Sequence, residues 1–238
     1  MFLKTKLLKL FKKFSIFFIK NFFNSTKNIE IILSVINQKK SFDDLKYCKT
    51  FEDPNVLYEN LFSPFSDEKI NLLEFGTYEG KSIKKFLSLN SNKSSKFYGF
   101  DSFLGLPEFW RKGFDKGAFN VNGRIPIIDD DRVTFIKGYF QNTLPKFILE
   151  NKFEENLFVH YDADLFSSTL YCLLKLDTLK IPYIAIFDEF HPDEVNALKK
   201  YIDMTSAKVE MISKVKNRVS FFPIQVSCKI IPSEVFKV

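Results

Sequence analysis

Acidic residues follow two apolar runs of this chain, and each run ends abruptly at them. Asp162 and Asp164 follow the first run, and Asp188 and Glu189 follow the second. Because the carboxyl ends of parallel strands share one edge of an open α/β sheet, we expect these side chains to meet at a ligand crevice. Carboxylates that repel one another are stabilised by a cation between them, and oxygen ligands suit Mg²⁺ or Ca²⁺. The pattern therefore predicts a site for a divalent cation.

Three earlier segments have the order and spacing of a nucleotide-binding site. Gly76 and Gly80 lie between an apolar run and a helix opened by Ser82, and glycine permits a tight turn and close approach of a ligand. Asp101 ends the next run, where an acid can accept both hydroxyls of a ribose. Gly138 ends a third run, where an adenine edge is expected. Each segment alone also fits an ordinary turn or helix cap, so the prediction depends on their combination.

In this order the motifs resemble those of the macrocin O-methyltransferase family. They are Glu-Phe-Gly-Thr-Tyr-Glu-Gly from residue 74, Gly-Phe-Asp-Ser-Phe-Leu-Gly-Leu-Pro-Glu from residue 99, Gly-Tyr-Phe-Gln-Asn-Thr-Leu-Pro from residue 138 and Asp-Ala-Asp-Leu-Phe-Ser-Ser-Thr from residue 162. The resemblance covers roughly residues 72–190. It implies a class I S-adenosylmethionine-dependent enzyme that methylates a sugar hydroxyl, as family members do, several of them with Mg²⁺.

The resemblance also implies roles for single residues. The residues that would hold S-adenosylmethionine, from its methionine end to its adenine, are Glu74, Gly76, Gly80, Ser82, Asp101, Ser102, Gly138 and Gln141. Asp162, Asp188 and Glu189 would bind Mg²⁺, and Asp162 is also the candidate general base. The family usually has Asp-Asp where this chain has Asp188-Glu189, so the third ligand has a longer side chain here. We expect Asp164 to cap the helix that follows it.

Apolar runs alternate with helical segments from about residue 67 onward. Strands are predicted over 70–75, 96–100, 133–137, 157–161, 183–187, 208–214 and 218–223, and helices over 81–89, 144–150, 168–179 and 193–204. This alternation predicts an α/β protein with a mostly parallel seven-stranded sheet, helices on both faces and an antiparallel edge strand. The resemblance implies that this is the Rossmann-like class I methyltransferase fold.

The connection over residues 102–132 is too long for a plain turn. It leaves from the end of a predicted strand, so we expect it to form a lid over the crevice. A surface insertion without function is the alternative. Glu108 and Trp110 in this segment are predicted either to touch the substrate or to pack at the surface, and His160 is predicted to be a core residue.

The basic charge is concentrated at the N-terminus. The net charge is +6, but residues 1–28 carry lysines and no acid, and the remainder is near neutral. We therefore expect no nucleic-acid partner. The lysine and apolar spacing suits a basic amphipathic helix, which would lie on an anionic membrane surface or pack on the domain or a second subunit. Residues 1–66 are predicted to be an N-terminal appendage, and residues 67–238 the methyltransferase domain.

The cysteines indicate a reducing compartment. Three cysteines lie far apart without a Cys-x-x-Cys motif, which argues against both a disulfide framework and a zinc site. No charge-free run is long enough to span a membrane. We expect a cytoplasmic protein, with peripheral contact at the inner face of the membrane as the alternative location.

Three functions remain open from the sequence. The first is metal-assisted O-methylation of a sugar or glycosylated small molecule by an enzyme that uses S-adenosylmethionine and Mg²⁺. The second is O-methylation of a catechol-like diol, and the third is a non-catalytic binding protein that keeps the fold. A nicotinamide dehydrogenase is disfavoured because the third glycine of its motif is missing.

Overall fold

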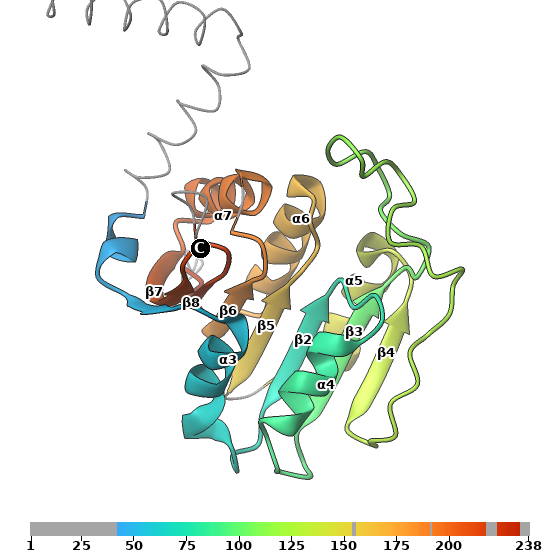
Figure 1. Cartoon of the computed structure of the whole chain (residues 1–238), viewed down its shortest axis with the longest axis horizontal. Coiled ribbons are helices and arrows are strands. Elements are labelled where there is room, and N and C mark those ends of the chain that lie inside the picture. The colour runs from blue at the N-terminus through green and yellow to red at the C-terminus, as the bar shows by residue number, and fades with distance from the viewer. Residues whose placement is uncertain (1–41, 154–155, 191, 218–222, 234–238) are drawn as a thin grey trace, which may run out of the picture. The chain divides into compact units, whose positions relative to one another are not determined.

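One eight-stranded sheet carries the fold in the part of the chain that the structure describes, residues 42–153, 156–190, 192–217 and 223–233 (Figure 1). In this computed structural model the strand order is β1-β7-β8-β6-β5-β2-β3-β4. The strands are β1 Lys49–Phe51, β2 Asn71–Phe75, β3 Lys96–Asp101, β4 Val133–Lys137, β5 Leu157–Tyr161, β6 Tyr183–Phe187, β7 Lys208–Val215 and β8 Val226–Ile231. Strand β8 is antiparallel to both of its neighbours, and all the other pairs are parallel.

The predicted mostly parallel α/β sheet is confirmed, but two of its details are wrong. Strand β1 adds an eighth strand, which the sequence did not reveal because it is three residues long and largely exposed at the sheet edge. The antiparallel strand is β8, which lies inside the sheet between β6 and β7 rather than at its edge. Of the last strand predicted, over residues 218–223, residues 218–222 lie outside the described residues, and Pro223 is in no strand.

The chain divides into compact units between Asp43 and Asp44. Residues 44–66, predicted to be part of the appendage, therefore belong to the same unit as the sheet. The basic amphipathic helix predicted within residues 1–28 lies outside the described residues. Among the described helices, none is both long and apolar enough to cross a membrane.

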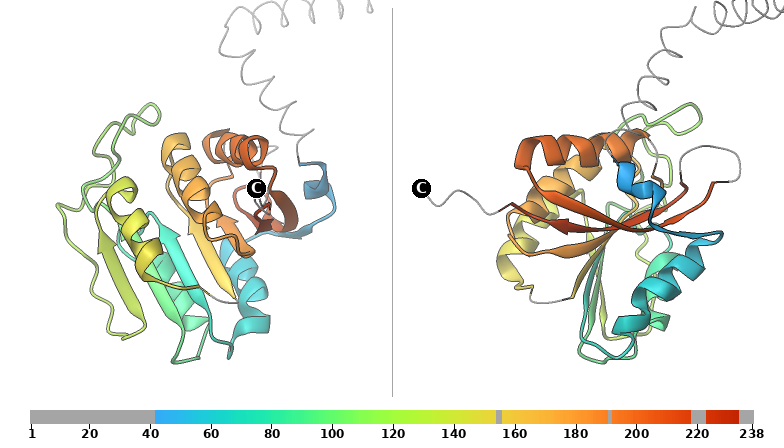
Figure 2. Two further views of the ribbon diagram at one scale, coloured as in Figure 1. Left: turned by 180° about the vertical axis from the view of Figure 1, so that it is seen from behind. Right: turned by 90° about the vertical axis from the view of Figure 1, so that its left-hand side faces the viewer.

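Helices cover both faces of the sheet, as the edge-on view in Figure 2 shows. They are α3 Pro54–Phe62, α4 Lys81–Ser88, α5 Phe140–Glu150, α6 Phe166–Asp177 and α7 Pro192–Thr205, with short 3₁₀ turns at Asp43–Lys46 and Ser63–Phe65. Helices α3 and α4 lie on one face, and α5, α6 and α7 lie on the other. Stacked rings of Phe62, Phe86 and Phe158 join α3, α4 and β5 in the core. Burying each such ring stabilises the fold by roughly 2–3 kcal/mol.

The connection over residues 102–132, which we call the lid, forms no regular helix or strand. Figure 1 shows its first part in green beyond the end of the sheet to which the parallel strands point, and its returning part beside β4, down to the start of that strand. It is nevertheless ordered by its own backbone hydrogen bonds, such as those that join Leu106 to Ala118 and Gly117. The N–H of Gly123 also donates to the carbonyl of Phe103, 2.7 Å away.

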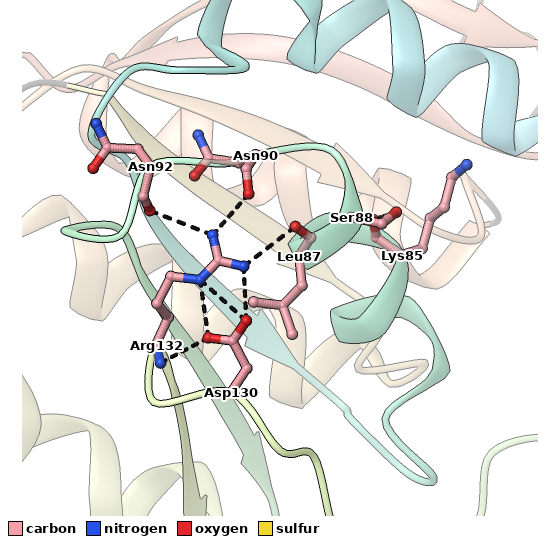
Figure 3. Close-up of polar contacts among 7 residues, drawn as sticks. All are labelled: Lys85, Leu87, Ser88, Asn90, Asn92, Asp130 and Arg132. Carbon is pink, nitrogen blue, oxygen red and sulfur yellow. Dashed lines mark hydrogen bonds and ion pairs between the residues drawn. The ribbon is translucent and has the colours of Figure 1, made fainter.

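The returning end of the lid is fastened by the buried side chain of Arg132 (Figure 3). Its guanidinium donates to the carbonyl oxygens of Leu87, Asn90 and Asn92, at 3.5, 2.7 and 3.3 Å. It also forms a two-pronged ion pair with Asp130, at 2.9 and 2.8 Å. This hydrogen bonding from Arg132 lowers the pKa of Asp130 to about 2. Arg132 thereby joins the start of β4 to the segment that follows α4.

Replacing Arg132 should destabilise the whole domain. Arg132→Leu removes the guanidinium that donates to three carbonyl groups and pairs with Asp130, so we expect the free energy of unfolding to fall by about 3 kcal/mol. Arg124→Leu is the matched control, because the Arg124 side chain is exposed and, within the part of the chain that the structure describes, donates only to the carbonyl of Val121. That variant should change stability by no more than roughly 0.5 kcal/mol. Equal losses in urea titrations of the two variants would contradict the anchoring role.

Candidate functional site

A cavity of about 390 Å³ opens at the carboxyl ends of the parallel strands, under the lid. Its wall includes residues that directly follow or end four neighbouring strands: Gly76, Asp101, Gly138 and Asp162. Of the predicted site residues, those that line it are Gly76, Asp101, Ser102, Gly138, Gln141, Asp162 and Glu189. The structure therefore brings together most of the residues that the sequence picked out, although their individual roles stay predictions.

Asp101 fixes the shape of the glycine-containing turn. One carboxylate oxygen accepts hydrogen bonds from the N–H groups of Thr77 and Tyr78, at 2.9 and 2.7 Å. The other oxygen accepts from the N–H of Phe103 at 2.6 Å. Each oxygen has two lone pairs, so the carboxylate holds the turn and can still accept from a ligand hydroxyl.

Gly76 is required by packing as well as by the turn. Its φ is +92°, a backbone conformation that favours glycine. A Cβ at this position would lie 1.8 Å from the carbonyl oxygen of Asp162. The end of β2 and the end of β5 thus approach each other more closely than any side chain would allow.

The lid supplies the aromatic side of the cavity. The lid residues that line it beyond Ser102 are Gly105, Leu106, Pro107, Trp110, Arg111, Phe114 and Phe119. Three polar contacts join the lid to the starts of α6 and α7 and to Glu189. Ser167 donates to Glu108 at 2.5 Å, and the indole of Trp110 donates to Asp193 at 3.0 Å. Arg111 Nη2 lies 3.4 Å from Oε2 of Glu189. Trp110 lines the cavity, so it does not simply pack at the outer surface, and its contact with a substrate stays a prediction.

Four predicted site residues do not line the cavity: Glu74, Gly80, Ser82 and Asp188. Gly80 begins α4 with φ +75°, and a Cβ there would lie 3.2 Å from Pro126 of the lid. The absence of a side chain at Gly80 therefore makes room for the lid. Ser82 lies in the first turn of α4, outside the cavity wall.

Glu74 and Asp188 flank the buried imidazole of His160. Glu74 on β2 is directly paired with His160 on β5, and both are buried. His160 Nδ1 is 2.9 Å from Oε1 of Glu74, and Nε2 is 3.5 Å from Oδ1 of Asp188. Burial disfavours the charged imidazole, but the two carboxylates outweigh it and raise the pKa of His160 to about 10. His160 is therefore an imidazolium at neutral pH. The prediction that His160 is a core residue is confirmed, but nothing in the sequence indicated that its side chain is charged.

Two further residues satisfy Asp188, and the sequence gave no signal for either. Tyr58 on α3 donates to Oδ1 of Asp188 at 3.4 Å, and the amide of Gln225 donates to the same oxygen. Burial would raise the pKa of Asp188, but the interactions with His160, Gln225 and Tyr58 outweigh it and lower the pKa. Asp188 is thus an ionised carboxylate held by donors of the protein.

The remaining acids repel one another. Burial and the charge of Asp188 raise the pKa of Asp162 well above its ordinary value. Burial and the charge of Glu189 raise the pKa of Asp164 to about 7. Glu194 on α7 is fully buried, and among the described residues neither of its carboxylate oxygens has a hydrogen-bond partner. Burial and the charge of Asp162 raise its pKa as well.

Asp164 does not cap the following helix, so that prediction is wrong. Helix α6 has Leu165 at its N-cap and no side-chain cap hydrogen bond. Asp164 instead has a left-handed backbone, with φ +59°, and its side chain lines the cavity. The left-handed conformation of Asp164 changes the direction of the chain before α6 and places its carboxylate at the cavity.

The carboxylates do not fit the predicted Mg²⁺ site. Among the residues that the structure describes, no three His, Cys, Asp or Glu side chains converge as a metal site requires. Asp188 is occupied by hydrogen-bond donors of the protein, and Glu189 is paired with Arg111. The resembled family usually has a second Asp where this chain has Glu189. The longer side chain of Glu189 agrees with the absence of fit, because it reaches Arg111 of the lid and does not turn toward Asp188.

Comparison with known proteins identifies the fold. No protein-family model and no curated protein sequence matches the chain. The crystal structure of the calicheamicin methyltransferase CalS11 is 20% identical over 72% of this chain and 77% of its own, with a TM-score of 0.54. An apo structure of CalS11, described as a TDP-rhamnose 3'-O-methyltransferase, is 18% identical over the same shares, with a TM-score of 0.45. An O-methyltransferase from Bacillus cereus in complex with SAH is 15% identical over 83% and 90%, with a TM-score of 0.46.

At such low identity the likeness to CalS11 shows the fold alone. It confirms the predicted Rossmann-like class I methyltransferase fold. Membership of the macrocin O-methyltransferase family stays a prediction, since the motifs that suggested it are not tested by a similarity of folds.

The charge on His160 should stabilise the fold up to alkaline pH. Its pKa is raised from 6.5 in the unfolded chain to about 10, so the stabilisation is complete below pH 6.5 and is lost as the pH rises through 10. His160→Gln should lower the free energy of unfolding by about 3 kcal/mol at pH 6.5, because Glu74 and Asp188 lose their cation. The difference from the wild type should shrink toward pH 10.

The control for His160→Gln is a surface ion pair. Lys85 pairs with the exposed carboxylate of Glu59 at 2.7 Å, and Lys85→Gln should cost less than about 1 kcal/mol. NMR titration of His160 provides the direct measurement. A resonance assigned to the His160 imidazole that titrates near pH 6.5 would contradict the assignment of a buried imidazolium.

Proposed function

We propose that this protein is a S-adenosylmethionine-dependent O-methyltransferase whose acceptor is a hydroxyl of a sugar or a glycosylated small molecule. One observation carries the proposal: the carboxylates of Asp101 and Asp162 and the turn at Gly76 face one cavity. The first carboxylate suits a ribose, the turn suits close approach of a ligand, and the second carboxylate suits proton transfer.

The cofactor would lie along the carboxyl ends of β2, β3 and β4. Gly76 and Tyr78 would border its methionine part, Asp101 its ribose, and Gly138 with Gln141 its adenine; all five residues line the cavity. The aromatic rings of Tyr139 and Phe140 add apolar wall beside them. When bound, S-adenosylmethionine supplies an electrophilic methyl group on a positively charged sulfur.

The acceptor would lie between the lid and the acids. The aromatic side chains of Trp110, Phe114 and Phe119 line this part of the cavity, together with Asp162 and Asp164. Apolar faces with a few polar groups are the usual walls of a small-molecule site. Carboxylates accept hydrogen bonds from hydroxyls, and so this part suits a polyhydroxyl acceptor. CalS11, whose fold is similar, is described as acting on a sugar nucleotide.

Asp162 would remove the proton of the acceptor hydroxyl. Its raised pKa makes it a stronger base than an exposed aspartate once the proton that it holds has been released. The deprotonated oxygen would then bond to the methyl carbon as the bond from that carbon to sulfur breaks, so that the products would be the methyl ether and S-adenosylhomocysteine, with the proton left on Asp162. Because donor and acceptor share one cavity, a large part of the acceleration would come from holding the two atoms in near-attack geometry.

Binding of S-adenosylhomocysteine is the first test. We expect a saturable rise in melting temperature with the wild type, and about tenfold weaker binding with Asp101→Ala, which loses the carboxylate acceptor of charge-assisted hydrogen bonds. Asp131→Ala is the control, because Asp131 is exposed and outside the cavity wall. No binding by the folded wild type, measured by calorimetry, would contradict the proposal.

Turnover and binding should separate at Asp162. Asp162→Asn keeps the size of the side chain but removes the base, so we expect turnover to fall by about 10² to 10⁴. Binding of S-adenosylhomocysteine should change less than twofold. The readout is methyl transfer from labelled S-adenosylmethionine to a panel of sugars and glycosides, and unchanged turnover would exclude Asp162 as the base.

A further inference from the structure

Arg111 is the cation that the lid brings to the acidic wall of the cavity. Its Nη2 lies 3.4 and 3.5 Å from the two carboxylate oxygens of Glu189. The same guanidinium lowers the pKa of Asp164, against the larger effects of burial and of Glu189. Two carboxylates of the opposite wall therefore share one positive charge that comes from the lid.

The guanidinium is held in a fixed position by aromatic rings. Its central carbon lies 3.6 Å from the ring centre of Trp110 and 5.0 Å from that of Phe114. These two rings also pack against each other, with centres 5.3 Å apart. A planar cation stacked on a ring loses little freedom when it forms an ion pair, which is why arginine suits this position better than lysine.

Trp110 also links the cation to the body of the domain. Its indole N–H donates to Asp193 at the start of α7, and Glu108 accepts from Ser167 at the start of α6. Closure of this part of the lid and delivery of the Arg111 charge are therefore a single event. If the lid opened, Glu189 and Asp164 would face each other without a cation.

We propose that Arg111 takes the charge-compensating place that a divalent ion would have at Glu189, so that the closed lid completes the site without a metal. This inference goes beyond the proposed function, because it concerns the lid and the acids and does not depend on the methyl donor. In it Arg111 is a positioning residue: it holds Glu189 and the lid in place and has no direct role toward the reacting atoms.

The first experiment measures hydrogen exchange in the lid. Arg111→Gln should increase the exchange rates of amides in residues 102–123 by about tenfold. The reason is that the lid loses the ion pair with Glu189, which opposes its local opening. Arg111→Lys, which keeps the charge but not the stacked plane, should give an intermediate increase. Arg124→Gln, in the same lid but away from the acids, should leave the rates unchanged. Equal rates in Arg111→Gln and Arg124→Gln would overturn the inference.

The second experiment asks whether Glu189 is the partner. In a Glu189→Gln background, Arg111→Gln should increase lid exchange by no more than about twofold, since the ion pair is already absent. A full tenfold increase in that background would overturn the inference.

The third experiment uses Mn²⁺ as a probe for a divalent site. We expect calorimetry to detect no saturable Mn²⁺ binding by the wild-type protein. Stoichiometric binding that is lost in Glu189→Gln would overturn the inference, because a metal and not Arg111 would then compensate this carboxylate. None of these measurements involves S-adenosylhomocysteine, so their failure is distinguishable from failure of the proposed function.

Discussion

Repulsion among carboxylates at the ends of β5 and β6 is the constraint around which the site is arranged. Asp162, Asp164, Asp188 and Glu189 lie within a few residues of two neighbouring strand ends, and each of them is half-buried. Such a group persists only if cations, donors or protons balance it. This protein uses all three: the imidazolium of His160 and the guanidinium of Arg111, hydrogen bonds to Asp188, and the raised pKa values of Asp162 and Asp164.

The two cations differ in how permanently they are present. His160 lies in the middle of the sheet between two carboxylates, and so its charge is part of the fold. Arg111 lies on a loop, and its charge reaches the acids only while the lid is closed. Successive residues after a strand can face different surroundings, and Asp188 and Glu189 do so. Asp188 faces His160, whereas Glu189 faces the lid. One carboxylate is therefore fixed in place and the other responds to closure.

The residues that could be predicted from the sequence are those that lie at the ends of strands. Gly76, Asp101, Gly138 and Asp162 each end or follow an apolar run, and parallel strands bring such positions to one edge. Prediction from the sequence failed where a contact depends on the order of strands or on the path of a loop. Gln225 reaches Asp188 because β8 lies between β6 and β7, and no local pattern reveals that order. Arg111 is one of several charged residues in a loop without periodicity, so nothing marked which of them would face the acids.

The backbone, more than the side chains, fixes the distance between the predicted donor turn and the predicted base. The N–H of Asp162 donates to the carbonyl of Phe75 at 2.9 Å, and the N–H of Gly76 donates to that of Phe100, also at 2.9 Å. The carbonyl of Asp162 occupies the space where residue 76 would carry a Cβ. A flexible side chain in that space would separate the two strand ends by more than the margin that a near-attack geometry allows. Glycine at residue 76 therefore sets the position of Asp162 relative to the turn, in addition to admitting a ligand.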